Sequence, residues 1–380
     1  MYMKSVPVAA AALAALTAPA SADERAISFP ETADGGVILT ADLHTHTVFS
    51  DGQVWPTIRV EEAHRDGLDL LAMTEHLEGQ PKRDDIPHRD RNRSYEVAVE
   101  SLVRAGYQGL LIINGAEITR AQPNGHINAV FLEDANKLLV DDPRASVEAA
   151  SAQGAFVFLN HPHWEPQAPD GIAKLTPYHE QLIEDGLLHG VEVANGTMDG
   201  HSEHALQFAL DKGLTVLGTS DIHGLVDWTH NAGHGGHRPM TLVLASDRSL
   251  ESMKTALFDG RTVAWNYDDL MGKAEHVRAV VGACLSLAPE PFNGRSTVLT
   301  VSIRNACPVN FTLQNTSEAT FQNRSDVITV PRNDAFPVRV RLGQEVEEIT
   351  LTFTVLNTQI GFREALSTTL NAAVPARVLE

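Results

Sequence analysis

Short apolar runs alternate with amphipathic segments between Val37 and Trp265 of this 380-residue chain. The apolar runs have the length of strands, and the segments between them have the apolar spacing of helices. Repeated strand–helix alternation predicts a parallel α/β sheet, and this many units predict a sheet closed into a barrel. We expect strands at 37–41, 69–73, 110–114, 126–132, 155–160, 190–194, 214–219 and 240–245, and helices at 57–66, 94–105, 143–153, 201–212 and 249–258.

The pattern changes after about Lys273, where alternation with a period of two replaces the strand–helix units. Residues 296–303 and 348–355 alternate in this way, and turn residues at 331–334 lie between them. This alternating pattern predicts a small antiparallel β-sandwich, and the segment contains no motif of catalytic or metal-binding residues. We therefore expect a barrel over residues 23–272 and a β-rich domain over 273–380, which packs against the barrel or mediates assembly.

The N-terminus has the layout of a secretory signal peptide. Lys4 precedes an apolar run at 6–16, and an Ala-x-Ala cleavage motif follows at 20–22. The run is too short to span a bilayer, and a buried N-terminal helix is the alternative interpretation. We expect residues 1–22 to be removed by cleavage after Ala22 and the protein to be exported to a bacterial periplasm.

Charge and cysteine content narrow the classes of partner. The formal net charge of −20 makes nucleic acid and anionic membranes poor partners. Bound divalent cations would nonetheless make the local electrostatic potential positive and attract an anionic small-molecule substrate. The sequence does not determine the oligomeric state. The two cysteines, Cys284 and Cys307, either pair in an oxidising compartment or remain two buried thiols.

Residues suited to binding metal recur where the apolar runs end. His44 and His46 follow the first run, and alternate side chains of a strand point to one face, so that both imidazoles can hold one ion. Active sites of such barrels gather at the C-terminal ends of the strands, so we expect the candidates to converge. Imidazole and carboxylate without thiolate suit Mn²⁺, Fe²⁺ or Zn²⁺ in a multinuclear site. The further candidates are Asp51, His76, Glu117, His126, His161, Asp221 and His223.

In their order along the chain, these residues resemble the motif set of the polymerase and histidinol phosphatase (PHP) family. The resemblance covers about residues 38–265 and implies a distorted (β/α)7 barrel that performs metal-dependent phosphoester hydrolysis. Two close metal ions would lower the pKa of a shared water toward about 7 and so supply the hydroxide for attack on phosphorus. The matching segments are His44-x-His46, Ser50-Asp51-Gly52, Thr74-Glu75-His76, Glu117, His126, His161-Pro162 and Asp221-x-His223.

The resemblance also implies how the ligands are shared among two or three divalent metal ions. Some family members carry His where this chain has Asp51, so the resemblance does not decide whether the third metal site is occupied. The implied sets are His44, His46, Glu117 and Asp221 for one ion, Glu117, His126 and His161 for a second, and Asp51, His76 and His223 for a third.

The leader, the appended β-rich domain and the segments 221–228, 237–243 and 260–265 are similar to exported phosphodiesterases of the Sb-PDE type. This narrower resemblance implies hydrolysis of organophosphate or other phosphate diesters. A phosphomonoesterase acting on a small phosphorylated metabolite is the alternative. A non-catalytic module that binds metal or phosphate is the third hypothesis.

Several residues near the motifs are candidates for direct roles in catalysis. Asp221 is expected to act in catalysis as well as in metal binding. His163 and His230 are candidate proton donors, and Arg238 is the candidate phosphate clamp, because a guanidinium binds two oxygens at once. Taken singly, each of these three is as consistent with an ordinary loop residue.

Four further residues have two interpretations each. Trp164 and Trp228 either form an apolar wall for an ester group or pack the rim of the barrel. Glu192 and Asn195 either orient the metal ligands or serve the fold alone.

Overall fold

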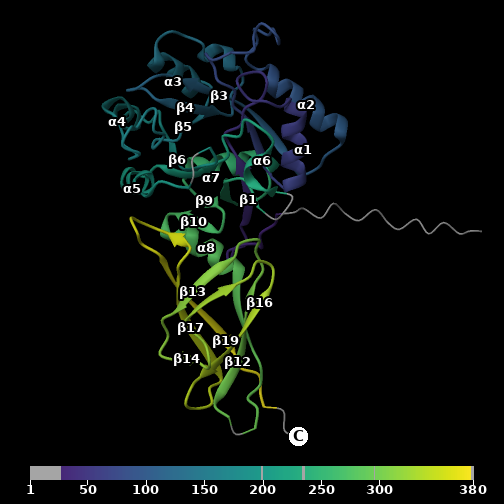
Figure 1. The fold of residues 1–380 in the computed structure, drawn as a ribbon, viewed down its shortest axis with the longest axis vertical. Coiled ribbons are helices and arrows are strands. Elements are labelled where there is room, and N and C mark those ends of the chain that lie inside the picture. The colour runs from purple at the N-terminus through teal and green to yellow at the C-terminus, as the bar shows by residue number, and fades with distance from the viewer. Residues whose placement is uncertain (1–26, 198–199, 233–235, 295, 378–380) are drawn as a thin grey trace, which may run out of the picture.

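The computed structural model describes residues 27–197, 200–232, 236–294 and 296–377. A barrel with surrounding helices and an elongated β-domain are stacked along the long axis of the molecule (Figure 1). The expected signal peptide lies outside the described residues. Within those residues, no helix has the length and apolar character needed to cross a membrane.

The barrel domain is built on a curled sheet. Its strands are β1 (Val37–Asp42), β2 (Leu70–Met73), β3 (Leu111–Thr119), β4 (His126–Val130), β5 (Phe156–Leu159), β6 (Gly190–Asn195), β7 (Thr215–Thr219), β8 (Met240–Ala245), β9 (Thr262–Asn266) and β10 (Asp269–Gly272). A strand of the β-domain, β18 (Thr358–Gln359), is added at one edge, which gives the order β18-β10-β9-β8-β1-β2-β3-β4-β5-β6-β7.

Helices cover the outside of this sheet, as the amphipathic segments predicted. The described helices are α1 (Pro56–Asp66), α2 (Arg93–Ala105), α3 (Pro143–Ser151), α4 (Pro177–Glu184), α5 (Glu203–Lys212), α6 (Val226–His230), α7 (Leu250–Phe258) and α8 (Ala274–Cys284), with a short 3₁₀ helix at Ala135–Leu138. Five of them, α1, α2, α3, α5 and α7, begin and end within two residues of the expected positions. The other three α-helices were not predicted, and α8 lies where the β-rich domain was expected to begin.

The expectation of an all-parallel sheet is wrong for three strands of the barrel, β4, β8 and β10, the last of which pairs antiparallel with β9. β4 runs antiparallel to both β3 and β5, and β8 runs antiparallel to both β1 and β9. Residues 120–125 form too short a connection for a parallel crossover, which needs a dozen or more residues, so β3 and β4 form a hairpin. The predicted architecture of a distorted barrel followed by a β-sandwich is otherwise confirmed.

Threonine hydroxyls join the two sides of the curled sheet. Thr241 Oγ1 on β8 donates to the carbonyl oxygen of Gly218 on β7 at 2.8 Å, and Thr262 Oγ1 on β9 donates to Val216 O at 2.7 Å. A Cβ at Gly218 would lie 2.6 Å from Met240 O, so only glycine permits this approach. These contacts bring β7 against β8 and β9 and close the barrel around its interior.

The β-domain is a sandwich of two antiparallel sheets, ordered β11-β12-β16-β14 and β15-β13-β17-β19. Burial alternates along its strands, which confirms the prediction made from the period-two pattern. The strands are β11 (Leu285–Pro289), β12 (Val298–Asn305), β13 (Phe311–Asn315), β14 (Thr320–Phe321), β15 (Val327–Val330), β16 (Ala335–Arg341), β17 (Glu348–Val355) and β19 (Leu366–Ala373).

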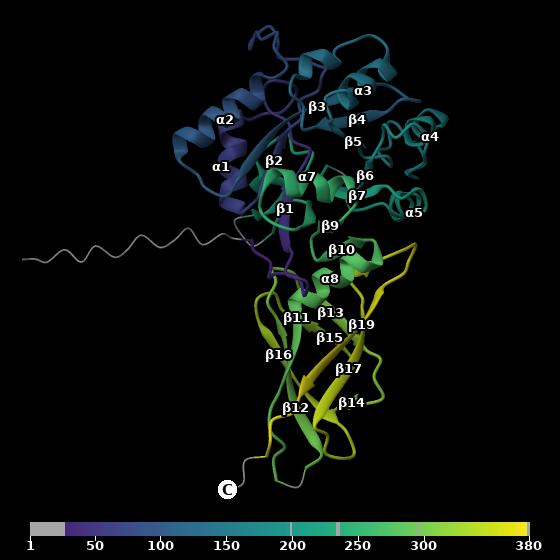
Figure 2. The same cartoon turned by 180° about the vertical axis from the view of Figure 1, so that it is seen from behind.

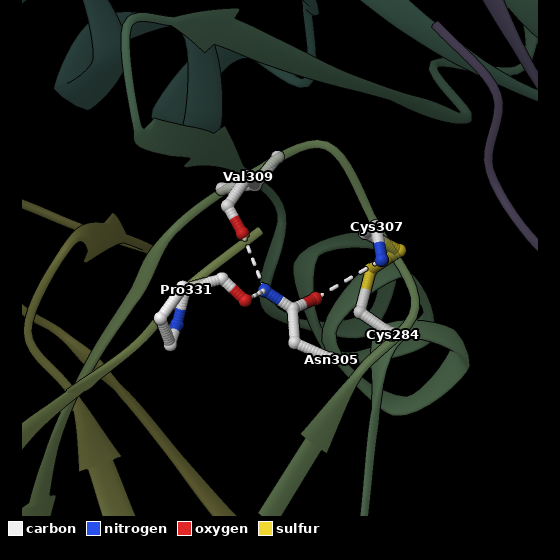
Figure 3. Close-up of a disulfide and its surroundings, with 5 residues drawn as sticks. All are labelled: Cys284, Asn305, Cys307, Val309 and Pro331. Atoms are coloured by element: carbon white, nitrogen blue, oxygen red, sulfur yellow. Dashed lines mark hydrogen bonds between the residues drawn. A yellow bond between two sulfur atoms is a disulfide. The ribbon is translucent and has the colours of Figure 1, made fainter. Parts of the chain in front are cut away.

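A disulfide between Cys284 and Cys307 joins the end of α8 to the turn after β12 (Figure 3). Beside it, Asn305 Nδ2 donates to the carbonyl oxygens of Val309 and Pro331 at 2.6 and 3.0 Å, and the backbone amide of Cys307 donates to Asn305 Oδ1 at 3.0 Å. The structure thus decides between the two interpretations of the cysteine pair in favour of the disulfide.

One apolar core runs from the base of the barrel into the sandwich. Trp265 of β9 and Val280 of α8 belong to the same cluster of buried side chains as Val301 and Phe311 of the β-domain. The two domains therefore share buried surface, and the linker between them is the helix α8.

Candidate metal centre

His44 and His46 lie just beyond the end of β1, at the centre of the barrel mouth. Their Nε2 atoms are 3.0 Å apart, and neither residue is exposed. Between them, Thr45 turns the other way, where its Oγ1 donates to Ala72 O at 2.7 Å, and its backbone pairs with that of Ile222. This alternation is what the His-x-His spacing predicted, and it brings two imidazole nitrogens to one point.

Two buried charged groups hold the backbone that follows His46. The guanidinium of Arg59 donates to His46 O at 3.0 Å and to the carbonyl oxygens of Ile222 and Gly224 at 3.1 and 2.6 Å. The carboxylate of Glu75 accepts from Thr47 N at 3.0 Å, and it also accepts from the hydroxyls of Thr47 and Ser50. Glu75 thus shapes the turn that carries Asp51 and does not itself face the metal ligands.

All nine predicted ligands converge in three groups, two of which share His46. Within each group, one donor atom from every member lies within 4.8 Å of the others. The groups are His44, His46 and Asp221; Glu117, His126 and His161; and His46, Asp51, His76 and His223. His126 joins its group because β4 is antiparallel, which places the start of this strand beside the ends of its neighbours.

One detail of the grouping differs from the implied sets, and another agrees with them, since Glu117 was expected in two of the sets. His46 lies near the third group as well as the first, because its ring stacks between those of His76 and His223, with centroids 4.5 and 4.4 Å away. Glu117 is positioned between groups, since its Oε2 is 3.6 Å from His44 Nε2 and 2.6 Å from His76 Nδ1, while its Oε1 is 2.8 Å from His126 Nδ1. A carboxylate so placed suits a bridging ligand.

Mutual proximity shifts the pKa values of these groups strongly in the metal-free protein. Burial lowers the pKa of His46 to about 4. Burial also opposes charge on His76, but the carboxylates of Glu117 and Asp51 outweigh it and raise the pKa of His76 to about 10. Burial would raise the pKa of Glu117, yet His76 and His44 hold it well below its usual value. The site therefore concentrates ionised carboxylates whose partners are imidazoles.

The donor set fits divalent metal ions. Glu117 Oε2, Asp221 Oδ1 and Asp51 Oδ1 are buried, and none of them has a hydrogen bond of acceptable geometry among the described residues. The same holds for Nδ1 of His126 and of His161. Buried polar atoms are nearly always satisfied, so five such atoms around one space indicate ligands to ions.

Two of the ligands have an unusual backbone conformation. His161 and Asp221 have φ values of 25° and 49°, in the left-handed region that residues other than glycine rarely adopt. Such strain persists where the surrounding structure demands a particular side-chain direction, and it concentrates at functional sites. Here it turns both side chains toward the other ligands.

A second layer of polar side chains holds the ligands in place. Glu192 is fully buried, and its carboxylate accepts from His44 Nδ1 at 2.6 Å, His161 N at 2.7 Å and Thr219 Oγ1 at 2.7 Å. Asn195 Nδ2 donates to Glu192 Oε2 at 2.9 Å and to Asp221 Oδ2 at 3.2 Å. These contacts support the interpretation that Glu192 and Asn195 orient the ligands.

The ligands open onto a cavity of about 340 Å³. Trp164 forms part of its wall, with its ring 5.2 Å from that of His161 and 5.4 Å from that of His126. Thr197 is the lining residue that the sequence did not reveal, since a single threonine after a glycine carries no pattern. Among the described residues that line the cavity there is no lysine or arginine: they are Asp51, His76, Glu117, His126, His161, Trp164, Thr197, Asp221 and His223.

The structure argues against Arg238 as a phosphate clamp. Its side chain is wholly buried and does not line the cavity; Nη2 lies 2.8 Å from Asp66 Oδ2, and Nη1 lies 3.3 Å from Asp42 Oδ2. The guanidinium therefore neutralises two buried carboxylates under the barrel mouth.

The two histidines proposed as proton donors also lie outside the cavity lining. His230 is 6% exposed, and burial together with Arg238 lowers its pKa to about 4, so that it is neutral near pH 7. Burial likewise lowers the pKa of His163. The positions of His230 and His163 therefore do not support either as a general acid.

Trp228 is 68% exposed, so it does not form the apolar wall.

Comparison with known proteins agrees with the domain arrangement. An Ig-like domain family, DUF5001, matches residues 285–371. No curated protein matches the sequence. Among solved structures, PsfC from Pseudomonas syringae PB-5123 aligns with 65% of this chain and 96% of its own at 18% identity, with a TM-score of 0.41.

A much stronger similarity covers both domains. The crystal structure of a two-domain protein from Bacteroides vulgatus ATCC 8482 aligns with 93% of this chain and 100% of its own. The sequence identity is 36% and the TM-score is 0.83, and that protein is described as containing a predicted PHP-like metal-dependent phosphoesterase. This chain therefore belongs to the PHP-like metal-dependent phosphoesterases, in a two-domain form with an Ig-like second domain.

Proposed function

We propose that this phosphoesterase acts on phosphate diesters. The observation that carries the proposal is the lining of the cavity, which has nine metal-binding or neutral side chains and no lysine or arginine among the described residues. A monoester presents a dianionic phosphoryl group, whereas a diester has a single charge and a second organic substituent. A cavity whose described lining has no lysine or arginine, with Trp164 on its wall, suits the diester better.

The residues that would hold the metal ions are the three groups described above. Bound divalent ions would supply Lewis acidity and would lower the pKa of water at the site. Glu192 accepts the Nδ1 proton of His44, which leaves the Nε2 lone pair directed at the ligands. Asn160 Nδ2 donates to Glu117 Oε1 at 3.0 Å and fixes the rotation of that carboxylate. Trp164 excludes water from one side of the cavity.

A comparison of two substrates tests the proposal. Metal-replete protein should hydrolyse bis(p-nitrophenyl) phosphate with a kcat/KM at least tenfold above that for p-nitrophenyl phosphate. His46→Ala should lose both this activity and bound metal. The reverse preference would favour a phosphomonoesterase, and full metal content with no turnover of either ester would favour a binding module.

We also propose that the protein is exported to a periplasm. The leader-like pattern of the first 22 residues supports this, as does the disulfide, because such bonds persist in oxidising compartments. Fractionation of expressing cells followed by N-terminal sequencing should find a chain that begins at Asp23 outside the cytoplasm. An intact N-terminus in the cytoplasmic fraction would contradict the proposal.

A further inference from the structure

We infer that the β-domain helps to position the substrate cavity, because Gln359 on its long hairpin holds one wall of that cavity in place. We call residues 356–365, which connect β17 to β19 and contain β18, the docking hairpin. It extends from the sandwich to the barrel, and it ends beside β10 and α5 in both views (Figures 1 and 2). The inference rests on the proposed diesterase function, which it deepens.

Backbone pairing fixes the docking hairpin to the barrel. β18 runs parallel to β10, with Thr358 opposite Leu270 and Gln359 opposite Met271. The barrel sheet therefore ends in a strand that the β-domain supplies. This pairing gives the side chain of Gln359 a defined position relative to the barrel.

The tip of the docking hairpin makes further contacts with α5. Phe362 N donates to Gln207 Oε1 at 3.2 Å, and Arg363 Nε lies 3.6 Å from Glu203 Oε2. These contacts hold the hairpin against the helix that follows the β6–α5 connection. The described parts of that connection are residues 196–197 and 200–202.

Gln359 makes the contact that reaches this connection itself. Its Nε2 donates to His201 Nε2 at 2.6 Å. The backbone of His201 pairs with that of Ala194 at the end of β6, and Ser202 N donates to Val193 O at 2.8 Å. Through His201, the β-domain is therefore tied to the strand end from which the cavity wall begins.

The last residue of β6 and the turn that follows it contact a metal ligand. Asn195 Nδ2 lies 3.2 Å from Asp221 Oδ2, and Thr197 Oγ1 donates to the same oxygen at 3.1 Å. Thr197 also lines the cavity. A continuous series of contacts thus runs from Gln359 through His201 and Ala194 to the wall that holds Asp221.

This arrangement makes Gln359 a positioning residue for the wall of the cavity that contains Thr197. Small displacements of such a wall have large effects on turnover, since a misplacement of about 1 Å can cost about 10²-fold. The side-chain contact of Gln359 is with His201, which is not one of the candidate metal ligands, so the loss of Gln359 should leave metal content unchanged. It should raise KM for a bulky aryl diester more than it lowers kcat.

Three variants of the full-length, metal-replete protein test the inference. Gln359→Leu keeps the volume and removes the hydrogen bond. Gln359→Glu restores it, because the imidazole of His201 can donate from Nε2 to a carboxylate. Leu356→Ala is the matched control on the same hairpin, where the side chain is 43% exposed. The measurements are metal content, kinetics with bis(p-nitrophenyl) phosphate, and hydrogen exchange of peptides covering β6 and the start of α5.

We expect Gln359→Leu to speed exchange in these peptides and to raise KM about fivefold or more, while Gln359→Glu and Leu356→Ala stay close to wild type. Wild-type exchange, or wild-type KM, in Gln359→Leu would overturn the inference. If the wild-type protein does not hydrolyse diesters, the diesterase proposal fails separately. The exchange measurement then decides whether Gln359 holds the wall.

Discussion

His44 and Glu192 form a wholly buried pair in which Nδ1 of the imidazole donates to a carboxylate oxygen 2.6 Å away. The other ring nitrogen of His44 faces His46 and Asp221, at 3.0 and 3.3 Å. Because one nitrogen is occupied by Glu192, only the other is available to a metal ion. The pair therefore fixes both the tautomer and the direction of a ligand.

Glu192→Gln should weaken metal binding about 10- to 100-fold, the usual effect of removing a carboxylate that supports a histidine ligand. The amide retains the shape of the side chain but loses the charge that favours the Nδ1 proton. Competition with a chelator of known affinity measures the change. Asp185→Asn on the surface is the control, and equal affinity in the Glu192 variant would show that the pair serves the fold alone.

Arg238→Met should destabilise the protein without affecting substrate binding. The variant would leave the carboxylate of Asp42 buried without its cation and would leave Asp66 with Arg65 alone, at a cost of about 3–5 kcal/mol in the free energy of unfolding. Urea denaturation measures this cost. Arg144→Met, where the side chain is 37% exposed, should cost at most about 1 kcal/mol.

Kinetics of the same variant separate the two roles considered for Arg238. A structural role predicts an unchanged KM for bis(p-nitrophenyl) phosphate in the folded fraction. Near wild-type stability together with a large rise in KM would restore the phosphate clamp.

Most of the metal ligands were predictable from sequence because they lie at or near the end of an apolar run, while Asp51 lies in a turn and was identified from the motif set. Strand ends of a barrel meet at one edge, so residues as distant as His44 and Asp221 converge without any pairwise information. The same reasoning accounts for His126 only after its strand is recognised as antiparallel. The short connection after β3 was the available signal.

Other parts of the site depend on contacts that a linear pattern does not contain. Arg238 follows a glycine- and histidine-rich segment, which resembles a polar lid, but its buried partners Asp42 and Asp66 are far away in the sequence. Thr197 lines the cavity because a turn after β6 directs it there. The docking hairpin could not be predicted from the sequence either, because a strand of two residues, β18, has no recognisable hydrophobic pattern.

His230 should make stability depend on pH in the acidic range. Its pKa is about 4 in the folded protein, where burial and Arg238 oppose the charged form, against about 6.5 when unfolded. Between these values the unfolded state binds more protons, so the contribution of His230 is complete above pH 6.5 and is lost as the pH falls toward 4.

Denaturation of wild type and His230→Gln at several values between pH 4.5 and 7.5 tests this dependence. The variant should show a shallower loss of stability on acidification than the wild type. His64→Gln, at a partly buried helix position, is the control. Parallel curves for wild type and His230→Gln would show that His230 does not titrate as its burial requires.

Reduction of the disulfide should destabilise the β-domain and spare the metal centre. Cys284 and Cys307 are 23 residues apart, and closing a loop of this size contributes about 3 kcal/mol to stability in the chain-entropy model. Cys284→Ser with Cys307→Ser should therefore lower the midpoint of thermal unfolding while metal content stays the same. Since the two domains share one apolar core, we expect a single transition in both proteins. Loss of metal at temperatures where the double variant remains folded would contradict this separation.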